Sequence, residues 1–143
     1  MQKIVILAII CITLLTSCKN LTDSTDVHKA EIKYIFEEIE ILYNSYNYGG
    51  LDDIMQFYNY DFLHNGLDKS DVRYIWEFER ISIYSTIDFS GISINFSDSE
   101  MSAIVEYTMT LSSGEEEVVD DIGESAHFSY LAGEWIITGN RVE

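Results

Sequence analysis

The chain has 143 residues, a formal net charge of −17 and an apolar content of 47%. A protein this acidic repels nucleic-acid phosphates and anionic lipid headgroups, so neither is an expected electrostatic partner, whereas a cationic protein or divalent ions would be attracted. The length is sufficient for one domain with its own core.

The N-terminal residues have the features of a bacterial lipoprotein signal. An apolar run over residues 4–15 follows Lys3, and the run ends in Leu15-Thr16-Ser17-Cys18. A transmembrane helix needs about 20 apolar residues, and a charged start, a short apolar middle and a small-residue exit are typical of a cleaved signal peptide. The final four residues resemble a lipobox. They predict that residues 1–17 are removed and that Cys18 carries the lipid, palmitate being a typical acyl chain.

Lipidation at Cys18 has consequences for the rest of the chain. The other cysteine, Cys11, leaves with the signal peptide, so no thiol remains for a disulfide, a metal site or a nucleophile. Two or three acyl chains, each methylene contributing about 0.8 kcal/mol, would hold the protein in the cell envelope. Lys19 after the cysteine implies the outer membrane in a host that has one. We expect a polar tether over residues 18–26 and one domain over residues 27–143.

Three helices are predicted before any long strand. Apolar residues at three-and-four spacing indicate an amphipathic helix over residues 27–46, with N-cap candidates just before it and Gly49-Gly50 after it. A shorter helix is expected over residues 51–60. Asn65-Gly66 then predicts a turn, and a third helix should run from Asp68 or Ser70 to about Arg80.

The period of the apolar residues changes to two after Arg80, which indicates strands. One parity is shared by Ile81, Ile83, Ile87 and Phe89, and the other by Ile92, Ile94 and Phe96, so Gly91 between them predicts a bulge or bend. Alternation over residues 101–111, 118–130 and 135–142 predicts three further strands. Helices followed by an antiparallel meander predict an α+β domain in which the first helix covers one face of the sheet.

This order of elements, with Gly133, Trp135 and Ile137 matching a Gly-x-Trp-x-Ile signature, resembles the nuclear transport factor 2-like superfamily. The resemblance implies a cone, in which three N-terminal helices pack on a strongly curved antiparallel sheet. The superfamily includes ketosteroid isomerases, dehydratases and polyketide cyclases as well as domains that bind without catalysing. Such a cone can hold a small apolar ligand. Candidates for lining its pocket are Tyr43, Tyr46, Tyr58, Trp76 and Phe128, although core packing explains these side chains equally well.

Acid and base candidates exist, but no motif selects among them. Asp61 and His64 lie three residues apart, and the carboxylate could orient the imidazole as a general base. Asp120 and Glu124 share the parity of apolar neighbours, so both could enter the cavity. We favour the simpler interpretation, with Asp61 and His64 serving the local turn and the two carboxylates solvated at a hairpin end beside Glu115 to Glu117.

The two remaining histidines, His28 and His127, are predicted to lie at the surface. Without thiols or a His-Glu-x-x-His spacing, no zinc site is expected, and no cofactor fingerprint is present. The sequence therefore favours a non-catalytic, lipid-anchored cone domain that binds a small molecule or a protein partner. The alternatives are an isomerase or dehydratase acting on a small apolar ligand through His64 and Asp61, and an acidic protein that neutralises a cationic partner.

Overall fold

The computed structural model describes residues 24–114 and 120–142. The predicted signal peptide, Cys18 and most of the predicted tether lie outside these residues, as do Glu115 to Glu117. Within the described part, no helix combines the length and apolarity needed to cross a bilayer.

The first element is the helix α2 (Ser24–Tyr46), which starts before the expected residue 27. Its start is fixed by the turn between two later strands, because the hydroxyls of Ser24 and Thr25 donate to the Glu100 carboxylate at 3.1 and 2.9 Å. The three-and-four apolar stripe is buried as predicted; it comprises Ile32, Ile35, Phe36, Ile39 and Tyr43.

The second helical segment is shorter than expected. It consists of η2 (Asn47–Gly50), α3 (Leu51–Ile54) and η3 (Met55–Phe57), and the backbone becomes extended at Tyr58 rather than after residue 60. The reason is a contact with the sheet edge. Tyr58 bridges to Ile137, and the next backbone N–H donates to the Ile137 carbonyl at 2.8 Å.

A small hairpin follows, formed by β1 (Leu63–His64) and β2 (Leu67–Asp68). Asn65 and Gly66 between them have φ angles of 50° and 82°, which confirms the predicted turn. Such angles are rare outside glycine, asparagine and aspartate.

The third helix runs from α4 (Lys69–Tyr74) into the wider π-helical η4 (Ile75–Ile81). The Asp68 carboxylate caps it by accepting from the N–H groups of Ser70 and Asp71, and the Asp71 carboxylate accepts from the N–H of Asp68. This complete capping box fixes the start of the helix. The expectation of a strand at Ile81 and Ile83 was wrong. Helical hydrogen bonding continues to the N–H of Ser82, which donates to the Glu77 carbonyl, and strand pairing begins only at Thr86.

One antiparallel sheet contains the four long strands in the order β3-β4-β5-β6. Its strands are β3 (Thr86–Phe96), β4 (Ser102–Ser112), β5 (Asp120–Leu131) and β6 (Glu134–Ile137). The pairing of β3 with β4 shifts register between Ser90 and Ser93, and Gly91 there has a φ of 62°, which confirms the predicted bend. The last strand ends at Ile137, earlier than expected.

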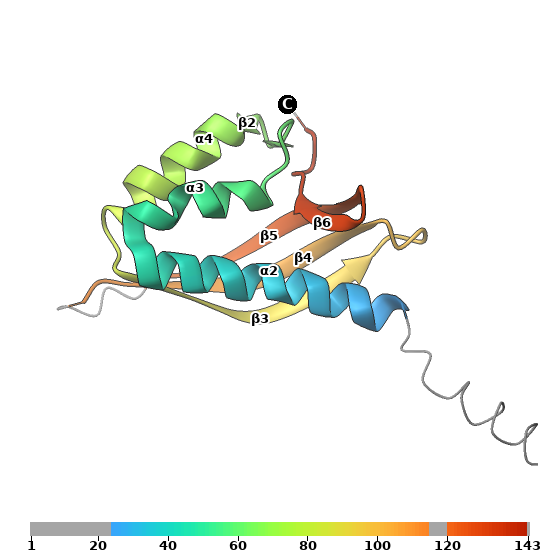
Figure 1. Cartoon of the computed structure of the whole chain (residues 1–143), viewed down its shortest axis with the longest axis horizontal. Coiled ribbons are helices and arrows are strands. Elements are labelled where there is room, and N and C mark those ends of the chain that lie inside the picture. Colours follow the sequence, from blue (N-terminus) through green and yellow to red (C-terminus); the bar gives the residue numbers. More distant parts are fainter. Residues whose placement is uncertain (1–23, 115–119, 143) are drawn as a thin grey trace, which may run out of the picture.

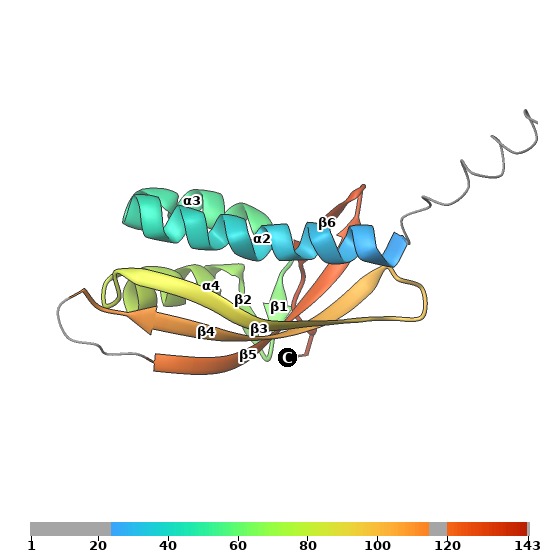
Figure 2. The same ribbon diagram turned by 90° about the horizontal axis from the view of Figure 1, so that it is seen from below.

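The helices cover one face of this curled sheet, so the expectation of an α+β domain with helices packed on a strongly curved sheet is confirmed (Figures 1 and 2). Helix α2 also protects the edge strand β3. The Asn44 side chain donates to the Ile87 carbonyl and accepts from the Ile87 N–H, each at 2.9 Å, and Glu40 accepts from the N–H of Phe89. Another strand therefore cannot pair with β3 at Ile87 and Phe89, where these side chains occupy the outward backbone groups.

Candidate functional site

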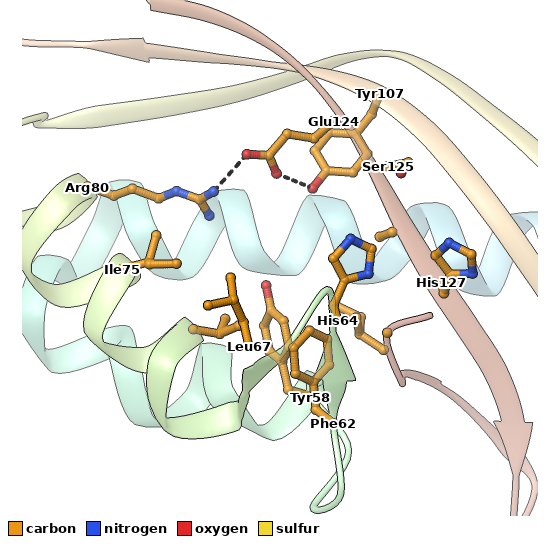
Figure 3. Close-up of a pocket in the computed structure, with 14 residues that line it drawn as sticks. Tyr58, Phe62, His64, Leu67, Ile75, Arg80, Tyr107, Glu124, Ser125 and His127 are labelled. Carbon is orange, nitrogen blue, oxygen red and sulfur yellow. Dashed lines mark hydrogen bonds and ion pairs between the residues drawn. The ribbon is translucent and has the colours of Figure 1, made fainter. Parts of the chain in front are cut away.

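A cavity of about 270 Å³ opens between the α4–η4 helix, the β1–β2 hairpin and the inner face of the sheet (Figure 3). One side of its wall is apolar and comes mainly from the hairpin and helix, including Phe62, Leu67, Val72 and Ile75. The other side is polar and comes mainly from β4 and β5. A concave site with an apolar body and a few convergent polar groups is the usual form of a small-molecule site.

Glu124 anchors the polar side, and both of its carboxylate oxygens are engaged. Arg80 donates to Oε1 at 2.9 Å from η4, and the Tyr107 hydroxyl donates to Oε2 at 2.8 Å from β4. The Arg80 and Glu124 side chains are only 14% and 29% exposed. The expectation that Glu124 is solvated was therefore wrong, because Arg80 reaches across from the helix and neutralises the carboxylate inside the cavity.

Arg80 is itself held by a second set of contacts. Its guanidinium carbon lies 4.5 Å from the centre of the Trp76 ring, which is a cation–π arrangement. The indole N–H of Trp76 then donates to the Tyr58 hydroxyl oxygen at 3.1 Å. The buried Trp76 therefore positions two polar residues of the cavity and does not line it.

The two tyrosines of the cavity remain protonated at neutral pH. Burial raises the pKa of Tyr107 well above its usual range, and the neighbouring Glu124 charge raises it further. Burial also raises the pKa of the Tyr58 hydroxyl, against a smaller opposing effect of Arg80. Both hydroxyls therefore act as hydrogen-bond donors.

His64 points into the cavity from β1 and has a defined proton position (Figure 3). The backbone N–H of Asn140 donates to its Nδ1 at 3.3 Å, so the neutral ring carries its proton on Nε2. Close packing fixes the backbone here, because a Cβ placed on Gly139 would lie 2.1 Å from the Leu63 carbonyl oxygen. No described residue hydrogen-bonds to Nε2.

His127 lies beside His64, with the two ring centres 5.7 Å apart, and contributes to the wall of the cavity. Burial lowers the pKa of His127, and the neighbouring His64 lowers it further. The prediction of a surface position was wrong for His127, because the Thr138 and Gly139 N–H groups pair with its carbonyl along the edge of β5 and the His64 ring lies beside its own. It was also wrong for His28, whose Nδ1 accepts from the Trp135 indole N–H at 3.0 Å and whose ring contacts Tyr130.

The remaining predicted site residues lie apart from this cavity. Asp61 pairs with Arg141 at 3.2 Å on the surface and does not orient His64. Tyr43 and Phe128 are fully buried in the core, where the Tyr43 hydroxyl donates to the Tyr84 carbonyl. The side chains of Tyr46 and Asp120 lie outside the described residues.

Sequence reasoning missed Arg80, Tyr107 and His127 as members of the site. The inward parity of Tyr107 between buried neighbours was the one available signal for it. Within the described part of the chain, no group of three or more potential metal ligands is present.

No protein-family model matches the sequence, and no curated protein is significantly similar to it. Several solved structures nevertheless share its fold. A nuclear transport factor 2-like protein of unknown function from Shewanella oneidensis is 18% identical, with a TM-score of 0.58, covering 78% of this chain and 94% of that chain.

Two further structures agree with this fold. A protein from Novosphingobium aromaticivorans that carries the provisional name of a scytalone dehydratase is 14% identical, with a TM-score of 0.61, covering 83% of this chain and 85% of that chain. A protein of unknown function from Nostoc punctiforme, described as having a cystatin-like fold, is 13% identical, with a TM-score of 0.60 and coverages of 78% and 86%.

Proposed function

Because this chain has the nuclear transport factor 2-like fold, we propose that it binds a small, uncharged, largely apolar molecule in the cavity between η4 and β5. We further propose that it does so as a lipid-anchored protein of the bacterial cell envelope, with Cys18 as the lipidated residue and the outer membrane as its location where the host has one.

The binding proposal rests on one observation, namely which hydrogen-bonding groups of the cavity are already engaged and which are still free. Both oxygens of Glu124 and the Nδ1 of His64 already accept hydrogen bonds. The Nε2–H of His64 remains available as a donor. So does the hydroxyl hydrogen of Tyr58, whose oxygen accepts from Trp76. The unused polar groups of Tyr58 and His64 are therefore both donors, and together they suit a ligand carrying an acceptor oxygen such as a carbonyl.

The charges of the cavity favour an uncharged ligand. Arg80 and Glu124 cancel each other, the two tyrosines are protonated, and the lowered pKa of His127 favours its neutral form. An anion would also enter against the field of a chain with a net charge of −17.

The same balance argues against His64 as a general base. A base needs a free lone pair, and the lone pair of Nδ1 accepts from the Asn140 backbone N–H while Nε2 carries the proton. Glu124 is equally engaged by Arg80 and Tyr107. These contacts therefore support ligand binding without proton abstraction by His64 or Glu124.

Three probes of one shape test this proposal: cyclohexyl methyl ketone, cyclohexanecarboxylate and cyclohexylamine. Binding to the mature protein in nanodiscs is measured by ligand-observed NMR, with empty nanodiscs as the blank. We expect the ketone to bind most tightly, and Tyr58→Phe to weaken it about fivefold, the value of one neutral hydrogen bond. Tyr60→Phe, at an exposed position, is the control. Failure of all three probes to bind contradicts the proposal.

The anchor has a separate test. Metabolic labelling with a radioactive fatty acid should mark the protein, and Cys18→Ser should abolish the label. Labelling that persists in Cys18→Ser would contradict lipidation at this residue.

One observation supports an enzymatic alternative of the dehydratase type. His127, with a lowered pKa, is available to accept a proton beside the donor Nε2–H of His64. An enzyme of this kind would release water from a cyclic β-hydroxyketone, and His127→Gln would abolish turnover while ketone binding stayed within about twofold. Absence of turnover in the wild-type protein excludes this alternative for that substrate class.

A further inference from the structure

A second concavity lies along the opposite side of the helical layer. This groove of about 860 Å³ runs between α2, the α3–η3 segment and the strand β6. No residue lines both this groove and the cavity.

The groove combines an apolar floor with acidic walls. Ile35 and Trp135 of the floor are buried at 6% and 5% exposure, and Phe57 and Leu42 extend the same surface. The walls carry four carboxylates, from Glu31, Glu38, Asp53 and Glu134, while the lining residues include no lysine or arginine. Like charges around an apolar floor repel one another, and a cation placed among them removes that repulsion.

The strand β6 contributes Glu134, Trp135 and Ile136 to the same groove. Tyr130, the partner of Trp135 in the ladder, directs its N–H to the Met101 carbonyl on the far side of β5, so Tyr130 and Trp135 are a non-hydrogen-bonded pair. The N–H and C=O of Trp135 therefore point away from β5, and no hydrogen bond from the described residues reaches them. Ile137 has the same orientation, and its carbonyl accepts from Asn59. This edge of β6 therefore already accepts a backbone hydrogen bond at Ile137, two residues beyond Trp135.

We propose that this groove binds an extended segment of a partner protein in which lysine or arginine alternates with apolar residues. In an extended chain, successive side chains point to opposite sides, so apolar residues would contact the floor while the cations meet the acidic walls. The segment would pair with the backbone of Trp135, as strands added to a sheet edge do.

The dimensions of the groove fit such a segment. Glu31 and Glu38 lie on one face of α2, separated by about 10 Å along the axis at 1.5 Å per residue. Alternate positions of an extended chain are about 7 Å apart, and flexible lysine side chains span the difference. The net charge of −17 disfavours a second copy of this chain as the occupant.

The test uses the mature protein in phosphatidylcholine nanodiscs and a short capped peptide in which lysine and valine alternate. Two matched peptides accompany it: one with glutamate in place of lysine, and one with N-methylated backbone amides along one edge. Affinity is measured by fluorescence anisotropy at low and high salt. We expect the lysine peptide alone to bind well, and its affinity to fall with salt as charge pairing is screened.

Charge-reversed variants locate the site. Glu38→Lys with Glu134→Lys should weaken the lysine peptide about tenfold, since each reversal removes an attraction and adds a repulsion at the rim. The control, Asp88→Lys with Glu106→Lys, makes the same change in net charge at exposed strand positions outside the groove lining and should weaken binding about twofold.

Equal losses in the two variants would overturn the proposal, because net charge alone would then explain binding. Equal binding of the glutamate or N-methylated peptide would also overturn it, as would self-association that the lysine peptide does not displace. None of these results bears on the ketone binding described above, since the two sites share no lining residue.

Discussion

The two ends of the domain interior are built on the same strands but contain different chemistry. At one end, the inward residue of β5 is Phe128, which is 1% exposed and packs against Phe36 of α2. At the other end, the inward residue of β5 is Glu124, which pairs with Arg80 of η4 beside a cavity of about 270 Å³. The comparison shows that strand parity alone does not determine whether an inward position belongs to the core or to the site, because the side chain that meets it from the helical layer differs.

The filled end should respond most strongly to truncation. Phe128→Ala removes a ring that packs 5.9 Å from the centre of Phe36, and we expect a loss of about 3–5 kcal/mol in the free energy of unfolding. Urea denaturation measures it. Ile104→Ala, at a half-exposed position of β4, is the control and should cost far less. A similar loss in both variants would contradict the assignment of Phe128 to the core.

The wall of the cavity contains a tight backbone approach between Gly139 and Leu63. Gly139→Ala would force its Cβ against the Leu63 carbonyl at a φ of 73°, so we expect about 2–4 kcal/mol of destabilisation together with displacement of His64. Gly133→Ala, with a φ of 98° and open space around it, isolates the backbone strain. Thermal unfolding of the two variants should differ clearly, and equal midpoints would show that the close approach has no effect.

At the cavity end, the free energy of unfolding should depend on the Arg80–Glu124 ion pair more than on side-chain volume. Glu124→Gln leaves Arg80 without its counterion in a partly buried position, and we expect a loss of about 1–3 kcal/mol in unfolding free energy. The matched change Asp61→Asn breaks the exposed pair with Arg141 and should cost about 0–1 kcal/mol. If urea denaturation ranks the two variants in the reverse order, the ion pair at Glu124 is not what holds this end together.

The smallest expected effect is a pH dependence from His127. Its pKa is lowered in the folded protein, so between the two pKa values the unfolded chain binds more protons and folding weakens as pH falls. The contribution is complete above the unfolded value of about 6.5 and is lost as pH falls toward the folded one. Urea titrations on either side of that value should show a shallow slope that His127→Gln reduces. If the slope of unfolding free energy against pH is the same in His127→Gln and in the wild-type protein, His127 is not the source of the pH dependence.

Much of the fold could be predicted because periodicity reports which residues of an element face inward. The stripe of α2, the turn at Asn65-Gly66 and the bend at Gly91 all depend on local spacing or on a backbone angle. Element ends were less accurate. The alternate spacing of Ile81 and Ile83 is the spacing of a strand, but helical hydrogen bonds continue to Ser82. These bonds belong to a π-helix, which the apolar periodicity does not reveal.

The site was harder to predict, because its polar pairs join residues far apart in the chain. Arg80 and Glu124 are 44 positions apart, and neither is recognisable as a partner of the other before the helix and the sheet are placed together. Asp61 and His64 are close in sequence, yet Arg141 and Asn140 satisfy them from the C-terminal segment. Their proximity in sequence suggested that Asp61 and His64 contact each other, whereas in the fold each contacts a residue of the C-terminal segment instead.

The bonds from Ser24 and Thr25 to Glu100 also have a mechanical consequence. Tension on the chain upstream of Ser24 enters α2 at its first turn, where those two hydroxyls fasten it to the loop joining β3 and β4. The load is therefore shared between the helix and this loop, and the two hydrogen bonds oppose separation of the helix start from the sheet. A pull on the first turn of α2 is thus resisted by the sheet as well as by the helix.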